Sequence, residues 1–213
     1  MRALVTGFDP FGGDDVNPSS RAVAGLPSRL GGIEIATAEL PTSYARSGEV
    51  LEDALRRVRP DIVLCVGQAG GRSELSLERV AINVQDARIR DNDGRQPIDI
   101  AIVAGGPAAH FTTLPIRACV AEMRRAGLPA GVSNTAGTFV CNHIFYVLMD
   151  ALGRNGLGAR GGFLHIPYLP AQAARLGGAP SMALADIVRG IEIVLSVSAA
   201  RTEDVLTAEG RLS

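Results

Sequence analysis

Residues 61–66 read DIVLCV, an almost unbroken apolar run that begins after Pro60. A strand with both faces buried needs apolar side chains on both sides, whereas a strand with one solvent-exposed face alternates apolar and polar residues. The run therefore predicts a central strand of a parallel sheet. Upstream, apolar residues recur at helical spacing through residues 50–58, so we expect a helix that ends at Pro60 and leads into this strand.

Strand and helix patterns alternate along the rest of the chain. We expect strands at residues 2–6, 33–39, 75–90, 98–104, 130–133 and 162–166, and helices at 116–123, 144–152 and 184–195. This alternation predicts an α/β protein, a three-layer α/β/α sandwich with a mostly parallel, twisted sheet. We expect a single domain over residues 1–213, with residues 203–213 as a frayed polar tail.

The composition excludes several classes of protein. The 213 residues carry 21 basic and 22 acidic side chains, so there is no electrostatic reason to bind nucleic acid or an anionic membrane. No apolar run approaches the ~18 residues that span a bilayer, and the N-terminus lacks the features of a signal peptide. Every basic residue is arginine, which excludes a Walker phosphate loop and Schiff-base chemistry. The three cysteines form no disulfide framework, and we expect a soluble, cytoplasmic protein.

Residues 156–161 read GLGARG and match the GxGxxG pattern of dinucleotide-binding loops. In that motif the glycines follow a strand and open a helix. Here they precede an expected strand, and no helix begins on them. We interpret the match as a coincidence in a glycine-rich chain.

Cys141 is the candidate nucleophile. It follows the turn-forming residues 133–138, SNTAGT, which lead from a strand into a helix. With Thr138 as N-cap, Cys141 would be the third helical residue, where free N–H groups and the helix dipole favour a thiolate and can hold an oxyanion. A buried packing residue is the alternative, and it is the favoured interpretation for Cys65 and Cys119, which lie in apolar surroundings.

A cysteine nucleophile usually works with a base, and the chain has three histidines. His165 ends an expected strand just before a proline-rich turn, where ligand-binding residues lie in such sheets. His143 is two residues from Cys141 on the same helix and points to another side, and His110 lies in a loop. We expect His165 within hydrogen-bonding distance of the Cys141 sulfur; a structural strand-end histidine is the alternative.

Glu78 is the candidate that would orient the imidazole. If residues 75–84 form one strand, its carboxylate shares a face with apolar side chains, and a charge in that position needs a partner. An edge carboxylate paired with an arginine is the other interpretation. The rivals Asp86, Asp91 and Asp93 have the neighbours of turn residues.

Three of the six phenylalanines lie close to these candidates. Phe8 and Phe11 belong to the glycine-rich turn after the first expected strand, and Phe139 lies two residues before Cys141. Aromatic side chains at the ligand-binding edge indicate a flat, uncharged pocket. Ordinary anchoring of loops to the core is the alternative, and for Phe8 alone it is preferred.

Taken together, these segments resemble the pyroglutamyl peptidase I family of cysteine peptidases. The resemblance rests on five segments in family order, which cover nearly the whole chain: TGFDPFGGDDVNPS at 6–19, GQAGGRSELSLERVAIN at 67–83, DARIRDNDG at 86–94, SNTAGTFVCN at 133–142 and GFLHIPY at 162–168.

The resemblance implies an enzyme that removes an N-terminal pyroglutamyl (5-oxoprolyl) residue from peptides through a thioester. It implies Cys141, His165 and Glu78 as catalytic residues, with Arg88 and the backbone of Cys141 at the oxyanion. The implied substrate pocket consists of Phe8, Phe11, Asn17, Gln68, Phe139 and Val140. No metal or organic cofactor is implied, and the family is cytosolic and often tetrameric, so we expect a homo-oligomer, either tetramer or dimer.

Two residues depart from the family pattern, so the resemblance does not define the rim of the substrate pocket. Arg90 stands where proline is frequent, and His110 stands where tyrosine is common.

Two other classes of function are compatible with the fold. A nucleoside phosphorylase or hydrolase would need a phosphate or ribose site, and a non-catalytic small-molecule-binding module would need no reactive thiol.

Overall fold

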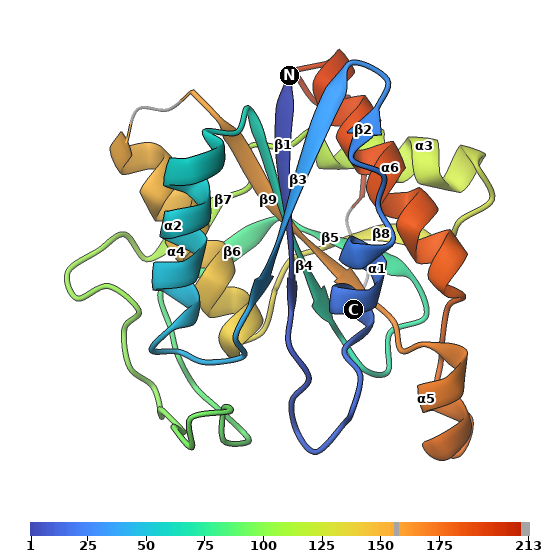
Figure 1. Cartoon of the computed structure of the whole chain (residues 1–213). Coiled ribbons are helices and arrows are strands. Elements are labelled where there is room, and N and C mark those ends of the chain that lie inside the picture. Colours follow the sequence, from blue (N-terminus) through green and yellow to red (C-terminus); the bar gives the residue numbers. More distant parts are fainter. Residues whose placement is uncertain (156–157, 210–213) are drawn as a thin grey trace.

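The computed structural model describes residues 1–155 and 158–209. A sheet of seven strands runs through its middle in the order β2-β3-β1-β4-β9-β5-β8 (Figure 1). The apolar run predicted as a central strand is fully buried in β4, between β1 and β9. The strands of this sheet are β1 (Arg2–Phe8), β2 (Arg29–Leu30), β3 (Ile33–Leu40), β4 (Ile62–Gln68), β5 (Leu75–Glu78), β8 (Ala130–Ser133) and β9 (Arg160–Ile166).

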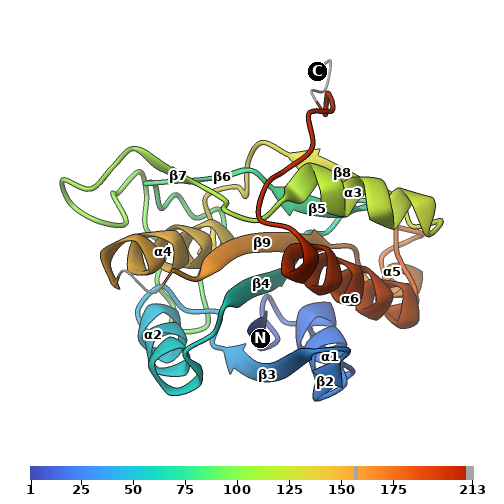
Figure 2. The same ribbon diagram turned by 90° about the horizontal axis from the view of Figure 1, so that it is seen from above.

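Helices cover both faces of the sheet, which confirms the three-layer α/β fold (Figure 2). One face packs against α1 (Pro18–Ala24), α3 (Ile116–Arg125) and α6 (Leu184–Ala200). The other face packs against α2 (Ser47–Val58) and α4 (Val140–Asn155). A short helix, α5 (Pro170–Arg175), follows β9.

The strand expected over residues 75–90 is broken after four residues. β5 ends at Glu78, and β6 (Val80–Ile82) leaves the main sheet to pair with β7 (Ala109–Phe111). The side chain of Asn142 on α4 holds this segment, because its Nδ2 donates to the Ile82 carbonyl at 2.9 Å and its Oδ1 accepts from the Ile82 N–H at 3.0 Å. β5 is also antiparallel to β9, whereas most other neighbours in the sheet are parallel.

The strand expected at residues 98–104 is wrong. This segment is a loop, and Ile98 and Ile100 are 76% and 52% exposed. The backbone hydrogen bonds of this segment go to a side chain and to one isolated bridge partner, and they form no ladder with a neighbouring strand. Asn83 accepts from the Val103 N–H at 2.9 Å, and Gln85 and Ile100 form an isolated bridge.

The register of the sheet decides which side chains share a face. Gly67 of β4 lies beside His165 of β9, and Ser76 of β5 lies beside His165 on its other side. Directly opposed residues point to one face, and so do residues two apart along a strand. Gly67, His165 and Glu78 therefore share the face that α4 covers.

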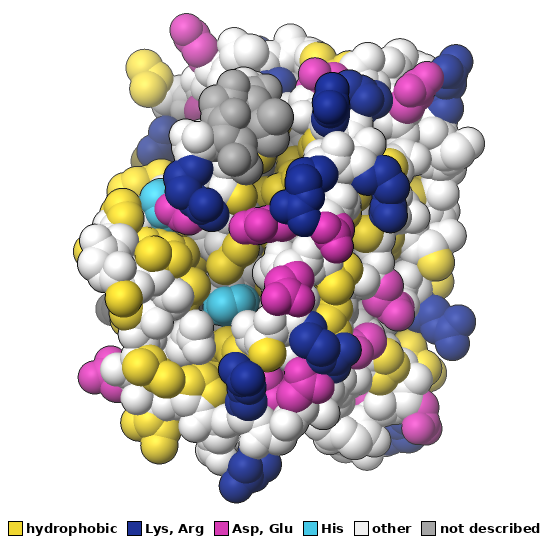
Figure 3. All heavy atoms as spheres, turned by 60° about the vertical axis from the view of Figure 1, so that its left-hand side comes forward, with side chains coloured by type: hydrophobic (Ala, Val, Ile, Leu, Met, Phe, Trp, Pro, Cys, Tyr) yellow, Lys and Arg dark blue, Asp and Glu magenta, His cyan; other side chains and the backbone are white. Residues whose placement is uncertain are grey.

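Charges of both signs are interspersed on the face that carries α2 and α4 (Figure 3). Arg56 lies 3.5 Å from Glu52 on α2, and Arg154 of α4 lies 3.6 Å from the same carboxylate and 2.7 Å from Asp150. These two arginines are therefore paired with acidic side chains rather than gathered into a positive field for a polyanion. Among the helices of the described residues, none has the length and apolarity needed to cross a membrane.

The C-terminal tail is more attached than expected. The Asp204 carboxylate accepts from the backbone N–H groups of Arg117 and Ala118 at 3.0 and 2.9 Å, at the start of α3, and Glu209 pairs with Arg124 at 2.9 Å. These contacts attach residues 204 and 209 of the polar tail to α3, and residues 210–213 lie outside the described chain. Of the GLGARG match, residues 156 and 157 also lie outside it, and the rest leads into β9.

Replacing Asp204 with alanine should leave the first N–H groups of α3 without this acceptor. Loss of a helix-capping side chain costs ~1 kcal/mol, so urea or thermal unfolding should show a free energy of unfolding lower by about that amount. Glu203→Ala is the matched control, because Glu203 is the exposed neighbour. Equal stability of the Asp204→Ala variant and the wild type would contradict the capping role.

Candidate active site

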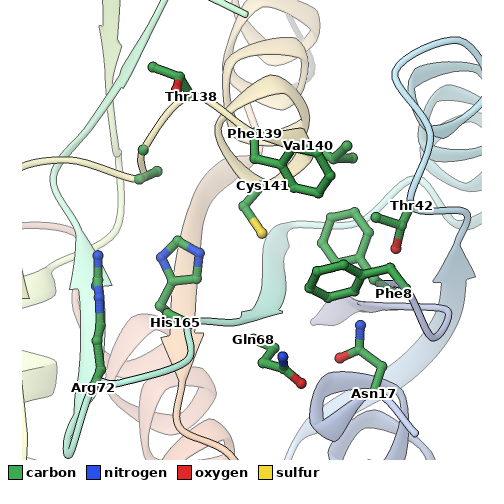
Figure 4. A pocket seen from close by; sticks show the side chains of 14 residues that line it. Phe8, Asn17, Thr42, Gln68, Arg72, Thr138, Phe139, Val140, Cys141 and His165 are labelled. Carbon is green, nitrogen blue, oxygen red and sulfur yellow. The ribbon is translucent and has the colours of Figure 1, made fainter. Parts of the chain in front are cut away.

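A cavity of about 210 Å³ opens at the carboxyl ends of β1, β4 and β9, beside the first turn of α4 (Figure 4). Sheets of this type bind ligands at this edge. Apolar side chains and a few polar ones line it: Phe8, Phe11, Asn17, Thr42, Gln68, Ala69, Arg72, Ala136, Gly137, Thr138, Phe139, Val140, Cys141 and His165.

Cys141 is the second residue of α4, which begins at Val140. The expectation that Thr138 caps this helix is wrong, because its hydroxyl donates to the Asp86 carbonyl at 2.7 Å. The first N–H groups of an α-helix have no intrahelical acceptor. Those beside Cys141 can therefore receive a negatively charged ligand atom, and the sulfur itself faces the cavity (Figure 4).

Gly67 allows the sulfur to lie directly on the sheet. A Cβ at this position would lie 2.8 Å from the Cys141 Sγ and 2.8 Å from the Phe163 ring, closer than real Cβ contacts come. Gly67 is also the residue beside His165 in the β4–β9 ladder, and neighbouring strands are ~4.8 Å apart. The sulfur and the imidazole consequently face the same small space (Figure 4).

His165 and Glu78 form a buried hydrogen-bonded pair. Nδ1 of His165 lies 2.7 Å from Oε1 of Glu78, whose side chain is fully buried. A carboxylate at Nδ1 holds the proton on that nitrogen and leaves Nε2 as an acceptor. The structure therefore brings together all three residues that the sequence analysis grouped: Cys141 from α4, His165 from β9 and Glu78 from β5.

Arg72 is a second partner of Glu78 that the sequence analysis did not single out. Its Nη1 lies 2.7 Å from the same Oε1, and its Nη2 donates to the Thr135 carbonyl at 3.3 Å. The available signal was Glu78 itself, because a buried carboxylate requires a cation or several donors.

Burial determines the resting charge of the cysteine and the histidine. It raises the pKa of Cys141 to about 12, an effect that Glu78 strengthens and Arg72 opposes. It also lowers the pKa of His165, although the hydrogen bond that the ring donates to Glu78 acts in the opposite direction. Burial therefore opposes the thiolate that the helix start favours, because a charged sulfur loses its hydration in this position. Both shifts favour a neutral thiol and a neutral imidazole in the ligand-free cavity.

Aromatic rings form one wall of the cavity. The centroids of Phe11 and Phe139 are 6.0 Å apart, and Tyr44 stands edge-on to Phe139 at 5.7 Å. Phe8 is 2% exposed and lies 6.4 Å from Phe163, so it anchors its loop to the core and also lines the cavity. The wall is uncharged, as these residues predicted.

The polar edge of the cavity is prearranged by hydrogen bonds. Asn17 accepts from the Ser19 N–H at 3.0 Å and donates to the Asp9 carbonyl at 2.9 Å. Gln172 of α5 donates to the Gln68 Oε1 at 3.2 Å, which leaves the Gln68 Nε2 for a ligand. Nothing in the sequence indicated that Gln172, which is 2% exposed, returns to this edge.

Arg88 does not join the cysteine and the histidine. It is exposed and absent from the lining of the cavity, so the structure offers no contact for its expected role at the oxyanion. Arg90, one of the two departures, is also exposed and donates to the Gly94 carbonyl at 2.7 Å.

The other histidines have their own environments. His143 lies with its Nδ1 3.2 Å from the Gln85 amide, and burial lowers its pKa to about 4. The Nε2 of His110 lies 3.7 Å from Asp150. Neither lines the cavity, in agreement with the choice of His165.

The rival aspartates hold loops, as predicted for turn residues. Asp91 is 5% exposed and accepts from the backbone N–H groups of Tyr44 and Arg95 at 2.9 and 2.8 Å. Asp93 pairs with Arg46 at 2.7 Å, and this hydrogen bond helps to lower the pKa of Asp93 to about 2. Within residues 1–155 and 158–209, no group of three His, Cys, Asp or Glu side chains is arranged to hold a metal ion.

Comparison with known proteins identifies close relatives. The family model of pyroglutamyl peptidase matches residues 1–201. Pyrrolidone-carboxylate peptidase 1 of Ralstonia nicotianae is 60% identical and pyrrolidone-carboxylate peptidase of Erwinia tasmaniensis 55% identical, each over 98% of both chains. Among solved structures, pyroglutamyl peptidase I of Bacillus amyloliquefaciens superposes with a TM-score of 0.94 at 47% identity, covering 97% of this chain and 99% of that one.

Alkylation by iodoacetamide should report the protonated state of Cys141. Because burial raises its pKa to about 12, the rate constant should rise roughly tenfold per pH unit from about pH 6 to about pH 9, since only the thiolate reacts. Peptide mass spectrometry separates Cys141 from Cys65 and Cys119, which are buried and serve as slow internal controls. A plateau already reached near pH 6 would instead reveal a resting thiolate–imidazolium pair.

Proposed function

The chain belongs to the pyroglutamyl peptidase family, and from this premise we propose that it removes N-terminal pyroglutamate from peptides by acyl transfer to Cys141. In this proposal His165 is the general base and acid, and Glu78 orients its ring. One observation carries the assignment: these side chains converge from α4, β9 and β5 at a cavity with an uncharged aromatic wall.

The first step transfers a proton and forms a bond together. His165 Nε2 takes the thiol proton of Cys141 while the sulfur adds to the carbonyl carbon of the pyroglutamyl residue. The direction of both shifts supports this order, since burial raises the pKa of Cys141 and lowers the pKa of His165 and so favours the proton on sulfur. Glu78 then stabilises the imidazolium through the Nδ1–H bond.

The tetrahedral intermediate places a negative charge on the former carbonyl oxygen. Backbone N–H groups of the first turn of α4 are suited to hold it, because they lack intrahelical acceptors. His165 gives its proton to the leaving amine, the C–N bond breaks and a thioester remains on Cys141. A water molecule then gives a proton to His165 and adds to the thioester, and collapse returns the proton to sulfur and releases pyroglutamate.

The cavity accounts for the choice of substrate. A pyroglutamyl ring is a flat, neutral lactam, whereas an ordinary peptide N-terminus is an ammonium ion. The wall formed by Phe11, Phe139 and Val140 can cover the lactam, and the free Nε2 of Gln68 can donate to its ring carbonyl. An ammonium in the same position would lose its hydration without gaining a partner.

The proposal also covers the cellular location, the oligomeric state and the substrates of the enzyme. The family resemblance supports a cytoplasmic homo-oligomer, tetramer or dimer, that acts on peptides with N-terminal pyroglutamate. The three cysteines are free thiols, which suits a reducing compartment and the chemistry of Cys141. The two alternatives, a riboside-cleaving enzyme and a non-catalytic binding module, gain no support from the cavity, which is lined by aromatic rings beside a cysteine and a histidine.

Cys141→Ser should abolish turnover of a pyroglutamyl–fluorophore amide. Serine keeps the shape but is a far weaker nucleophile in this setting, so kcat should fall by ~10³-fold or more. Cys119→Ala is the control, because Cys119 is a buried thiol on α3 outside the cavity. Comparable activity of the Cys141→Ser variant and the wild type would refute the proposed nucleophile.

Discrimination against prolyl substrates should be steep. A prolyl–fluorophore amide has the same ring size but carries a charged amine and lacks the ring carbonyl. Its kcat/KM should be ~10⁴-fold below that of the pyroglutamyl amide, the range seen when a site's polar groups are left unpaired. If the two substrates differed by less than tenfold, the neutral pocket could not be the source of specificity.

A further inference from the structure

Arg72 is the charged side chain of the cavity to which the acyl-transfer steps assign no task. Its Nη1 and the Nδ1 of His165 each lie 2.7 Å from the same oxygen of Glu78, Oε1. The other oxygen, Oε2, is buried and has no hydrogen-bond partner. The contacts of this carboxylate therefore converge on one atom, with a cation on one side and the imidazole on the other.

A carboxylate without that cation would change the state of the histidine. An imidazolium beside a buried carboxylate is stabilised by the opposite charge, so the ring would hold a second proton more tightly. A ring that is already an imidazolium cannot take the proton of Cys141. A guanidinium bonded to the same carboxylate cancels much of this attraction.

The position of Arg72 is itself held by the loop that leads to the cysteine. Nη2 donates to the carbonyl of Thr135, six residues before Cys141, at 3.3 Å. The side chain is 28% exposed, against none for Glu78. Arg72 thus joins the β4–β5 connection, β5 and the β8–α4 loop at the buried carboxylate.

We propose that Arg72 is a positioning residue that acts through Glu78 to keep the resting His165 ring neutral and its Nδ1–H directed at Oε1. This inference rests on the proposed function, because it concerns the base of that reaction. A purely structural ion pair would hold Glu78 in place but would not affect the pH at which the ring gains its second proton.

The groups that face His165 give the direction of the effect. They are Glu78 from β5, Arg72 from the β4–β5 connection and Cys141 from α4. The thiol of Cys65 on β4 acts on Cys141 rather than on the ring. Glu78 raises the pKa of His165 and Arg72 lowers it. Burial still lowers the pKa of His165 when Arg72 is removed, but the electrostatic opposition of Arg72 to Glu78 is lost. The ring therefore protonates at a higher pH than in the wild type, and activity is lost earlier on acidification.

The test is the pH profile of kcat/KM for a pyroglutamyl–fluorophore amide, which reports the groups of the free enzyme. The acid limb of Arg72→Gln should lie ~1 pH unit above that of the wild type, a tenfold change in proton affinity. Arg72→Lys, which keeps the charge, should recover at least half of this shift. Arg154→Gln is the matched control, because it removes an arginine from ion pairs on the outer side of α4, and its limb should not move.

The inference would be overturned if Arg72→Gln lowered kcat/KM by the same factor at every pH, so that its acid limb stayed at the wild-type pH. It would also be overturned if the acid limb of Arg72→Lys shifted as far as that of Arg72→Gln. If Arg72→Gln does not fold, the comparison is made in the Glu78→Gln background, which leaves no buried carboxylate unpaired. In that background Arg72→Gln should leave the acid limb where Glu78→Gln places it, because the carboxylate through which Arg72 acts is absent. A shift of ~1 pH unit caused by Arg72→Gln in that background would contradict the role.

Failure of the proposed function would be recognised separately, as a wild-type enzyme without pyroglutamyl amidase activity. The effect of Arg72 would then be read from the imidazole nitrogen shifts of His165 during an NMR titration. The pKa of the ring should be higher in Arg72→Gln than in the wild type. An unchanged pKa would overturn the inference independently of turnover.

Discussion

The fully buried carboxylate of Glu78 is the constraint on which the site depends. A charge removed from water needs compensation by donors or by an opposite charge, and here a guanidinium and an imidazole meet at one of its oxygens. Those two contacts tie the β4–β5 connection and β9 to β5. The third tie, from Arg72 to the Thr135 carbonyl, reaches the loop before the reactive cysteine. A single buried charge therefore couples the segments that must be aligned for proton transfer.

The fold supplies the alignment through register and through one missing side chain. The ladder between β4 and β9 places Gly67 beside His165, and Gly67 leaves just enough room for the Cys141 sulfur. The first turn of α4 can then lie directly on the sheet, and Asn142 fastens it to β6 through the Ile82 backbone. Distance between sulfur and imidazole is thus controlled by backbone positions, which are stiffer than side chains.

Much of this arrangement was predictable from sequence, and the failures have physical causes. The apolar run in β4 and the helical periodicities report burial directly, so the layers followed from them. The run at residues 98–104 misled, because apolar composition does not reveal that side chains such as Asn83 satisfy its backbone. Arg72 and Gln172 were missed because each acts through a tertiary contact that no sequence pattern reports. The effect of burial on the pKa of Cys141 was not foreseen, because a helix start is visible in sequence, whereas the surroundings of the sulfur are not.

The close seat of the Cys141 sulfur on Gly67 also bears on oxidative damage. β4 closes one side of the sulfur, and a peroxide that enters through the cavity would pass through the space proposed for the lactam ring. Oxidant and substrate should therefore exclude one another. Burial of the thiol also disfavours its oxidation, because oxidation to a sulfenic acid proceeds through the thiolate. The glycine that gives the sulfur its place on the sheet therefore also limits the directions from which an oxidant can reach it.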